Sequence, residues 1–264
     1  MSDALIGSSG FVGSTLARQK QFAEAYRSTN IQDIDGRQFD QLVCAAAPAQ
    51  KWIANREPGP DLLNIERLIS HLKTLQCNTF ILISTVDVFG HPVGVDESTP
   101  VAEAGLHPYG LHRRYLEKFV EGHFSNHLIV RLPGLVGPGL RKNIIFDLLH
   151  GNSISAIDSR SVFQFYPMVN LWSDIQCALD AGLTLVHLAT EPTSVADVAR
   201  LGFGTHFDQT LSGPPAKYDM QTRHAHLFGA EGRYLYDQRE TIHAVRSYAQ
   251  YEPRAIERRP KIAT

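Results

Sequence analysis

The sequence predicts an α/β protein with a doubly wound parallel sheet and a small carboxyl-terminal lobe, and two observations support this fold class. First, a short apolar run at residues 4–6 is followed by Gly7, Gly10 and Gly13 and at once by a helical pattern. Second, several later runs are apolar throughout, as in strands buried on both faces, and they alternate with amphipathic stretches. Strand, glycine turn and helix in this order open a Rossmann-like sheet, so we expect that architecture.

The three glycines have separate expected roles. Gly7 allows the tight turn, Gly10 lets the backbone approach a pyrophosphate, and Gly13 lets the helix pack closely against the strand. The amino end of the helix then presents free N–H groups and a partial positive charge to phosphates. The predicted dinucleotide contacts of this turn also include Ser9, Phe11 and Val12. The alternative is a strand-turn-helix unit whose glycines serve packing alone.

Length and charge limit the classes of protein that fit. The chain has 264 residues, enough for one large α/β domain or a domain with a small lobe. Its formal net charge of -2 gives no sign of a nucleic-acid partner. No apolar stretch approaches the ~18 residues of a membrane span, and the glycine turn lies so close to Met1 that we expect no signal peptide. The sparse cysteines, Cys44, Cys77 and Cys177, indicate reduced thiols and a cytoplasmic location.

The second strand, a weak one at 24–27, bears on the choice of cofactor. An NAD-specific site places an Asp or Glu at the tip of this strand, where it accepts from the ribose 2′-hydroxyl. Here the tip carries Arg27, Ser28 and Thr29, which suit a 2′-phosphate better, so NADP is favoured over NAD. Either Asn30 with Ile31 or Asp33 with Ile34 is expected to contact the adenine, the polar residue at the ring edge and the apolar one at its face. The alternative is that Arg27 is a solvated edge residue.

The third strand is expected at 41–47. The gap before it is too short for a full crossover helix, so this corner of the sheet is predicted to be trimmed. The strand ends in Ala45, Ala46 and Ala47, whose small side chains would let a cofactor lie across its end. Pro48 stops it.

Polar residues follow the next strand, the clearest buried one in the chain, at 79–84. An amphipathic helix at 61–75 precedes it, with Asp61 expected as its amino-terminal cap. Thr85 and Asp87 stand just beyond the strand. Ligands of open α/β sheets bind at the carboxyl ends of strands, so this cluster is a site candidate.

Another helix is predicted from Tyr109, where Tyr109 and Arg113 lie four residues apart and therefore on one face. A buried strand at 127–132 follows and ends in a turn-rich stretch at 133–139. His112 lies beside Arg113, but adjacent helix positions point apart. We therefore expect His112 to be solvated or partly packed.

The second half of the chain is less regular. Strands are expected at 161–169 and 184–188, and helices at 143–149, 171–181, 195–200 (capped by Thr193) and 237–249. Residues 202–235 are rich in Gly, Pro and aromatics, which indicates a loop-built lobe. A frayed tail is expected at 253–264. We predict an NAD(P)-binding domain at 1–140 and a smaller substrate lobe at 141–264, with interleaved elements.

Three separated motifs now occur in one order: the Gly7 turn, Ser84-Thr85, and Tyr109 with a base four residues later. In this the chain resembles the extended short-chain dehydrogenase/reductases, the nucleotide-sugar epimerase, dehydratase and reductase superfamily. The segments 131–138, 165–174 and 191–199 and the pair Tyr218-Asp219 resemble later elements of that superfamily. The resemblance covers nearly the whole chain.

The resemblance implies roles for several residues. Tyr109 would be the acid/base at a hydroxyl or carbonyl, Thr85 would hydrogen-bond the same oxygen, and Arg113 would hold the cofactor ribose. A neighbouring cation and the nicotinamide charge would lower the pKa of Tyr109 toward working pH. Asn64 and Pro133 match cofactor-contacting positions. In many relatives the helices matching 61–75 and 107–122 pack into a homodimer.

The sequence departs from the superfamily pattern at three positions. Arg113 replaces the usual Lys, and an arginine stays charged, so it is not a practical proton carrier. Asp87 stands alone where the 4,6-dehydratases carry adjacent Asp and Glu, which argues against that reaction. Gly134 replaces an Asn that touches the diphosphate of a sugar nucleotide.

These observations predict an NAD(P)-dependent oxidoreductase or epimerase acting on a hydroxyl or keto group of a sugar or sugar nucleotide, with a reductase favoured. The candidate substrate contacts are Lys51, Asp87 and Tyr166, with Trp52 as a further one. The alternative for Asp87 is a turn-forming residue, and for the other three it is surface or lobe packing. The histidines show no metal-ligand spacing, so no metal site is expected. The competing interpretation is a dinucleotide-binding module without turnover, with a sensing or scaffolding role.

Overall fold

The computed structural model describes residues 1–253. Its strands are β1 (Ser2–Ile6), β2 (Glu24–Tyr26), β3 (Gln38–Cys44), β4 (Gln76–Thr85), β5 (Val93–Val95), β6 (His127–Leu132), β7 (Gly134–Val136), β8 (Val162–Phe163), β9 (Phe165–Pro167), β10 (Leu185–His187), β11 (Thr193–Ser194) and β12 (Asp219–Met220). Its α-helices are α1 (Phe11–Gln19), α2 (Lys51–Arg56), α3 (Pro58–Leu72), α4 (Pro108–His123), α5 (Ile144–His150), α6 (Leu171–Asp180), α7 (Val195–Asp197) and α8 (Gln238–Tyr251). Short 3-10 helices lie at Ile31–Ile34, Val86–Val88, Ile154–Ala156, Met168–Asn170 and Ala225–Phe228, and a π-helical segment at Val198–Phe203.

The core of the fold is a six-stranded sheet in the order β10-β6-β4-β3-β1-β2. Every neighbouring pair is parallel. The chain passes from the edge strand β2 to β3, on the other side of β1, through only the 3-10 helix Ile31–Ile34. The expected trimming of this corner is therefore confirmed.

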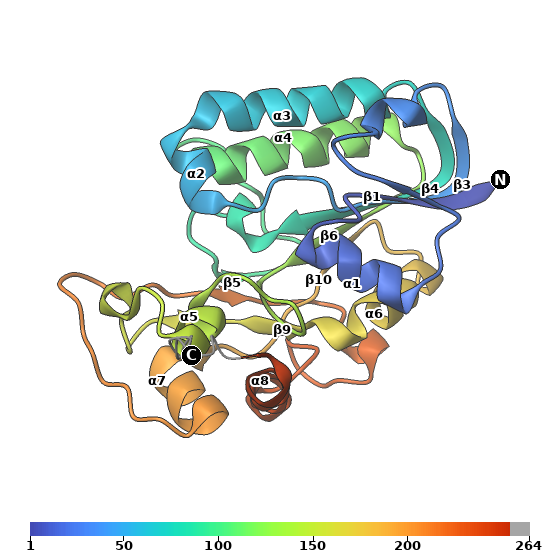
Figure 1. Ribbon diagram of the computed structural model, residues 1–264. Helices are drawn as coiled ribbons and strands as arrows, with labels where there is room; N and C mark the ends of the chain where they lie inside the picture. The colour runs from blue at the N-terminus through green and yellow to red at the C-terminus, as the bar shows by residue number, and fades with distance from the viewer. Residues whose placement is uncertain (254–264) are drawn as a thin grey trace, which may run out of the picture.

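The strands are buried on both faces, as their apolar runs predicted. Alternate residues of β4 face opposite ways: Phe80 and Leu82 pack with α3 and α4, while Ile81 and Ile83 pack with α6 and with Leu16 of α1. Helices α3 and α4 run side by side over one face, and α1 and α6 cover the other (Figure 1). This three-layer arrangement confirms the predicted parallel α/β fold class.

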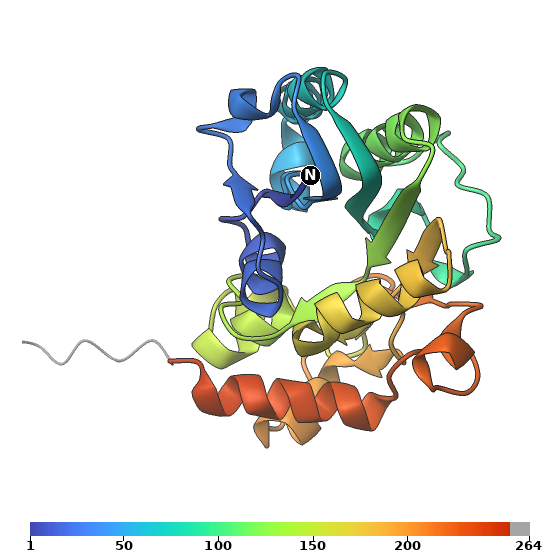
Figure 2. The same cartoon turned by 90° about the vertical axis from the view of Figure 1, so that its right-hand side faces the viewer.

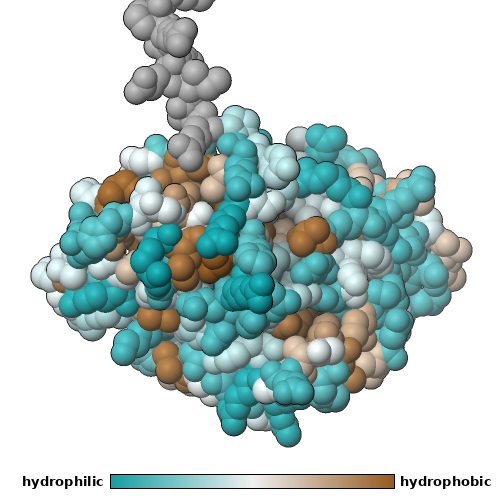
Figure 3. Space-filling view, turned by 90° about the horizontal axis from the view of Figure 1, so that it is seen from below, coloured by the Kyte–Doolittle hydropathy of each residue, from teal (hydrophilic) through white to brown (hydrophobic). Residues whose placement is uncertain are grey.

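A lobe lies beyond α1 and α6, below the sheet in Figure 1. It contains three small two-stranded sheets (β7 with β9, β8 with β11, β5 with β12) and helices α5, α7 and α8. Figure 2 shows α8 running along the outer side of this lobe. Figure 3 shows the molecule from the side of this lobe. Hydrophilic residues cover most of that face, and the hydrophobic residues form small separate groups. Between lobe elements, the chain returns to the main sheet to form β10 beside β6.

Several element boundaries differ from the sequence-based expectation. Helix α3 begins at Pro58, since proline is favoured in a first turn, and Asp61 lies inside that turn instead of capping it. Ser194, rather than Thr193, caps α7, because its hydroxyl accepts from the N–H of Asp197 at 3.0 Å. The strand expected at 161–169 is divided into β8, β9 and a 3-10 turn. Most of the tail expected at 253–264 lies outside the described residues.

Candidate active site

The glycine turn between β1 and α1 is built as the sequence predicted. Gly7 has φ +89°, and a Cβ there would collide with the backbone of Ala45. A Cβ on Gly13 would collide with the carbonyl of Gly7, so both glycines are needed by the chain itself. A Cβ on Gly10 would meet only the Gly7 oxygen, at an ordinary 3.5 Å. The fold alone does not require glycine at this position, and the open space there suits a closely approaching ligand.

The amino end of α1 is open. No side chain caps the helix at Gly10, and Ser9 is exposed. Phe11 and Val12 are half-buried against the hydrophobic core between the sheet and α6. An uncapped helix end of this kind is an anion-binding position. The turn thus offers backbone N–H groups where a pyrophosphate would need them.

The tip of β2 carries no acidic residue. Arg27 and Ser28 are exposed, and the N–H of Arg27 donates to Asn30 Oδ1 at 2.7 Å. Glu24, the acid of this strand, is instead bound to the hydroxyls of Tyr26 (2.5 Å) and Ser2 (2.7 Å) and to Arg37. The guanidinium of Arg27 makes no hydrogen bond or ion pair within residues 1–253, so it is available to a ligand.

The carboxyl end of β3 continues into Ala45, Ala46 and Ala47, which are half-buried beside the Gly7 turn. Pro133 is buried at the end of β6. Asn64 is exposed on α3. The residue of this helix that contacts Arg113 is Asp61, about one turn earlier. The cofactor role of Asn64 stays a prediction.

Tyr109 stands at the amino end of α4, whose first turn is fixed by two side chains. His107 Nδ1 accepts from the N–H of Gly110 at 3.0 Å, and Asn55 Oδ1 accepts from the N–H of Tyr109 at 2.9 Å. A Cβ on Gly110 would collide with the Asp87 carbonyl, so this glycine lets the helix end pack on the segment after β4. Tyr109 is thereby brought to the carboxyl end of β4, beside Thr85.

Burial raises the pKa of Tyr109, while the Arg113 charge and a hydrogen bond from Thr85 oppose that rise. Thr85 Oγ1 also accepts from the N–H of Asp87 at 3.2 Å, which leaves its proton free to donate. The expected lowering by the neighbouring cation is therefore present but is smaller than the effect of burial. At neutral pH the phenol is protonated.

Arg113 is buried, and all four N–H groups of its two terminal nitrogens face protein acceptors. Nη1 donates to Asp61 Oδ2 and, at 3.4 Å, to the Tyr109 carbonyl. Nη2 donates to Asp61 Oδ1 at 2.9 Å and to the Pro48 carbonyl. Its Nε is buried without a partner, which leaves one donor for a ribose hydroxyl.

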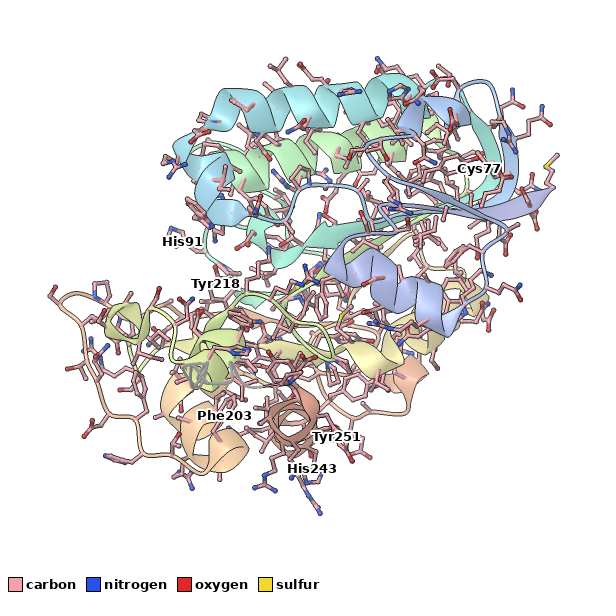
Figure 4. The ribbon with its side chains drawn as sticks, viewed as in Figure 1. Cys77, His91, Phe203, Tyr218, His243 and Tyr251 are labelled. Atoms are coloured by element: carbon pink, nitrogen blue, oxygen red, sulfur yellow. The ribbon has the colours of Figure 1, made fainter. Side chains whose placement is uncertain are left out.

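A polar triad lies next to Tyr109. Lys51 Nζ donates to Asp87 Oδ1 at 2.8 Å and to the Tyr218 hydroxyl at 3.1 Å, and that hydroxyl also donates to Asp87 Oδ1 at 3.1 Å. Burial lowers the pKa of Lys51, but Asp87 and Tyr218 outweigh it and the net shift is upward. Figure 4 places Tyr218 between the sheet and the lobe. Sequence reasoning singled out Lys51 and Asp87 as substrate contacts, but it gave Tyr218 no role in a site.

The position of Tyr166 corrects the expected substrate pocket. Tyr166 does not line it, because its ring is fully buried between β9 and α6 and its hydroxyl donates to Asp174 at 2.5 Å. Trp52 is 63% exposed and its ring lies against Arg56. Tyr166 is therefore not part of the Tyr109 site, and the substrate role of Trp52 stays a prediction.

His112 is also corrected. It is buried, and its Nδ1 lies 2.7 Å from Asp61 Oδ2, the same oxygen that accepts from Arg113 Nη1. Within residues 1–253, no group of three or more His, Cys, Asp or Glu residues is placed to hold a metal ion. In the same part of the chain, no helix is long and apolar enough to cross a membrane.

The residues present fit a dinucleotide. Gly10 leaves a hollow that a Cβ would fill, α1 begins without a cap, and Arg113 Nε is a buried donor without an acceptor. These features lie at the carboxyl ends of β1, β3 and β4, where open α/β sheets bind ligands.

The sequence matches no protein-family model and no curated protein sequence. Its structure is similar to a dTDP-4-dehydrorhamnose reductase from Clostridium acetobutylicum (TM-score 0.72, 15% identity, 95% of this chain and 99% of that one). It is also similar to a UDP-glucuronic acid 4-epimerase from Bacillus cereus in complex with UDP-glucuronic acid and NAD (0.69, 16%, 95% and 99%). A UDP-glucose 4-epimerase from Thermotoga maritima matches to the same degree (0.69, 16%, 95% and 98%). The chain therefore has the fold of these epimerases and reductases.

Proposed function

We propose that this chain is an NAD(P)-dependent oxidoreductase or epimerase of the extended short-chain dehydrogenase/reductase type, acting on a hydroxyl or keto group of a sugar or sugar nucleotide. The observation that carries the proposal is the placement of Tyr109 and Thr85 together at the end of β4, on the sheet edge that also holds the glycine turn. In this proposal residues 1–140 form the cofactor domain and 141–264 supply most of the substrate lobe.

The chemistry divides between the cofactor and the chain. Bound NAD(P) would supply or accept the hydride. Thr85 would hydrogen-bond the substrate oxygen, and Tyr109 would transfer a proton at that same oxygen. Lys51, Asp87 and Tyr218 would contact the rest of the substrate.

A reductase is the favoured reaction. Because a tyrosine is protonated at neutral pH and burial raises the pKa of Tyr109 further, its hydroxyl is ready to donate to an oxygen that gains charge as hydride arrives. Oxidation would first require loss of that proton. The exposed Arg27, with no acid at the tip of β2, supports NADP over NAD.

The first test is a fluorescence titration with NADPH and with NADH. Tighter binding of NADPH supports the enzyme and the Arg27 argument, and preference for NADH rejects the specificity argument alone. Binding of neither rejects the proposal. Tyr109→Phe should then abolish carbonyl-dependent oxidation of NADPH at 340 nm while leaving its dissociation constant nearly unchanged, and retained turnover would reject the assignment of Tyr109.

A second candidate function is a dinucleotide-binding module without turnover. It is favoured by Arg113, whose terminal nitrogens are occupied by Asp61, Pro48 and Tyr109 and which cannot relay a proton. Such a module would bind NADPH and show no change at 340 nm with any carbonyl compound. A homodimer through α3 and α4 stays a prediction; Leu63 and Tyr115 are exposed on those helices.

A further inference from the structure

Asp61 is a buried carboxylate that serves two residues of another helix. It lies in the first turn of α3 and is 6% exposed. Its two oxygens accept from both terminal nitrogens of Arg113, and Oδ2 also pairs with His112 Nδ1 at 2.7 Å. Burial raises the pKa of Asp61, but the bonds from Arg113 and His112 outweigh it and the net shift is downward, so the group is ionised.

The paired guanidinium lies on the acid/base tyrosine. Arg113 Cζ is 4.0 Å from the centroid of the Tyr109 ring, within the range of a cation–π contact. Because Asp61, Pro48 and Tyr109 together accept from four of its five N–H groups, the plane of the guanidinium is fixed. The fifth group, on Nε, is buried and has no partner.

An arginine at this position needs such a partner more than a lysine would. Its charge is spread over a planar fork on a long side chain, so one contact does not set its orientation, whereas two parallel bonds to a carboxylate do. A buried cation without an acid is also costly. Asp61 meets both needs, and it does so 52 residues away in sequence from Arg113.

We propose that Asp61, supported by His112, is a positioning residue that holds the Arg113 guanidinium against Tyr109 and leaves Nε as its one donor for a ligand. The assignment of Tyr109 as the acid/base rests on the proposed function, but the arrangement itself does not. Asp61 acts only through Arg113, since it touches neither the Tyr109 hydroxyl nor the open side of the site in the described contacts.

The effect is measurable because Tyr109 senses the Arg113 charge. The other charged or titratable groups around this pair are Asp87, Lys51, Tyr218, His107 and Lys142. None of these bonds to Asp61, so an exchange of Asp61 leaves them in place. A change in the ionisation of Tyr109 on that exchange would therefore report on Arg113.

The test is Asp61→Asn, with Glu66→Gln as a control that makes the same charge change on the exposed side of α3. Tyrosine labelled with ¹³C at Cζ, with Tyr109 assigned by Tyr109→Phe, gives the pKa of Tyr109 by NMR over the pH range in which the protein stays folded. We expect Asp61→Asn to raise that pKa by about one unit, because Arg113 leaves the ring. Arg113→Gln should raise it as much, and the double variant no further.

Three results would overturn the proposal: an unchanged pKa in folded Asp61→Asn, a lowered pKa, or additive effects of the two exchanges. A lowered pKa would mean that Asp61 only neutralises an Arg113 that stays in place. Should Asp61→Asn not fold, the ¹⁵N spectrum of the unmodified protein decides. Slow rotation of the Arg113 guanidinium supports the proposal, and free rotation rejects it. Neither readout needs cofactor or substrate, so a failed NADPH titration would reject the proposed function and leave this inference standing.

Discussion

A Cβ atom on Gly134 would lie 2.5 Å from the carbonyl oxygen of Gln164. That oxygen cannot easily yield, because the Gln164 side chain is buried and bonded to the backbone of Thr190 and Met220. Gly134 therefore sets the spacing of β7 and β9. An asparagine at this position, which the resemblance associates with diphosphate binding, has no room here.

We expect Gly134→Ala to lower the free energy of unfolding by about 2 kcal/mol through overpacking. Urea denaturation monitored by circular dichroism measures this change. Gly122→Ala is the matched control, since nothing lies within 4 Å of its Cβ position on α4, and it should be neutral or slightly stabilising. Equal stability of the Gly134 variant and the unmodified protein would contradict the packing argument.

Gly10 and Gly13 should separate cofactor binding from folding. Gly10→Ala meets no tight contact in the chain, so its melting temperature should stay close to that of the unmodified protein. Its methyl group would occupy the phosphate hollow and weaken NADPH binding about tenfold, or about 1.4 kcal/mol. Gly13→Ala should instead unfold at a lower temperature, because its Cβ collides with the Gly7 carbonyl. Undiminished NADPH affinity in Gly10→Ala would count against phosphate binding at the glycine turn.

Arg27 should decide between the two nicotinamide cofactors. Its exchange for Asp removes a cation from the tip of β2 and supplies the acceptor that a ribose 2′-hydroxyl prefers. The ratio of the NADPH and NADH dissociation constants should shift toward NADH by about tenfold or more. Arg67→Asp, the same charge change on the exposed side of α3, should leave the ratio alone. If both variants keep the original ratio, Arg27 is only a solvated edge residue.

His187 should make the fold sensitive to acid. It is fully buried, its Nδ1 lies 2.9 Å from the Gln221 carbonyl, and burial lowers its pKa to about 4. Between about pH 6.5 and 4 the unfolded chain binds a proton that the folded chain does not. The free energy of unfolding therefore falls as the pH is lowered through this window, by about 3 kcal/mol at most.

Chemical denaturation at a series of pH values measures this dependence. His187→Gln removes the titrating group, so its stability should change less between pH 6.5 and 4. The difference between the two curves isolates His187 from the carboxylates that also titrate there. Parallel curves would mean that His187 is not held neutral by the fold.

The sequence predicted the elements well where the pattern of burial along the chain is simple. The strands of the main sheet are covered on both faces, so residues such as those at 79–84 are apolar without interruption and are recognisable. The glycine turn was equally clear, because Gly13 is required by its contact with nearby Gly7 and Gly7 by its φ of +89°, although the backbone that a Gly7 Cβ would meet, at Ala45, is distant in sequence. Helix ends were less certain, and Pro58 rather than Asp61 opens α3.

Pairings distant in sequence could not be predicted. From the sequence, Asp61 is a typical helix cap. Its ion pair with Arg113, 52 residues away in sequence, is formed only when the chain folds. The Tyr218 hydroxyl reaches Asp87 across 131 residues. For Tyr166 the error was the reverse. The sequence suggested a substrate contact, but the register of β9 with β7 places its side chain in the core.

The pairing of β10 with β6 also constrains how the chain can be made. Until Leu185–His187 has left the ribosome, β6 remains the last strand of the sheet and its outer row of N–H and C=O groups has no partner. Such an edge invites pairing with other chains. The nascent sheet therefore stays vulnerable to aggregation until more than about seven-tenths of the protein has been synthesised, and we expect the lobe segment before β10 to determine how long that exposure lasts.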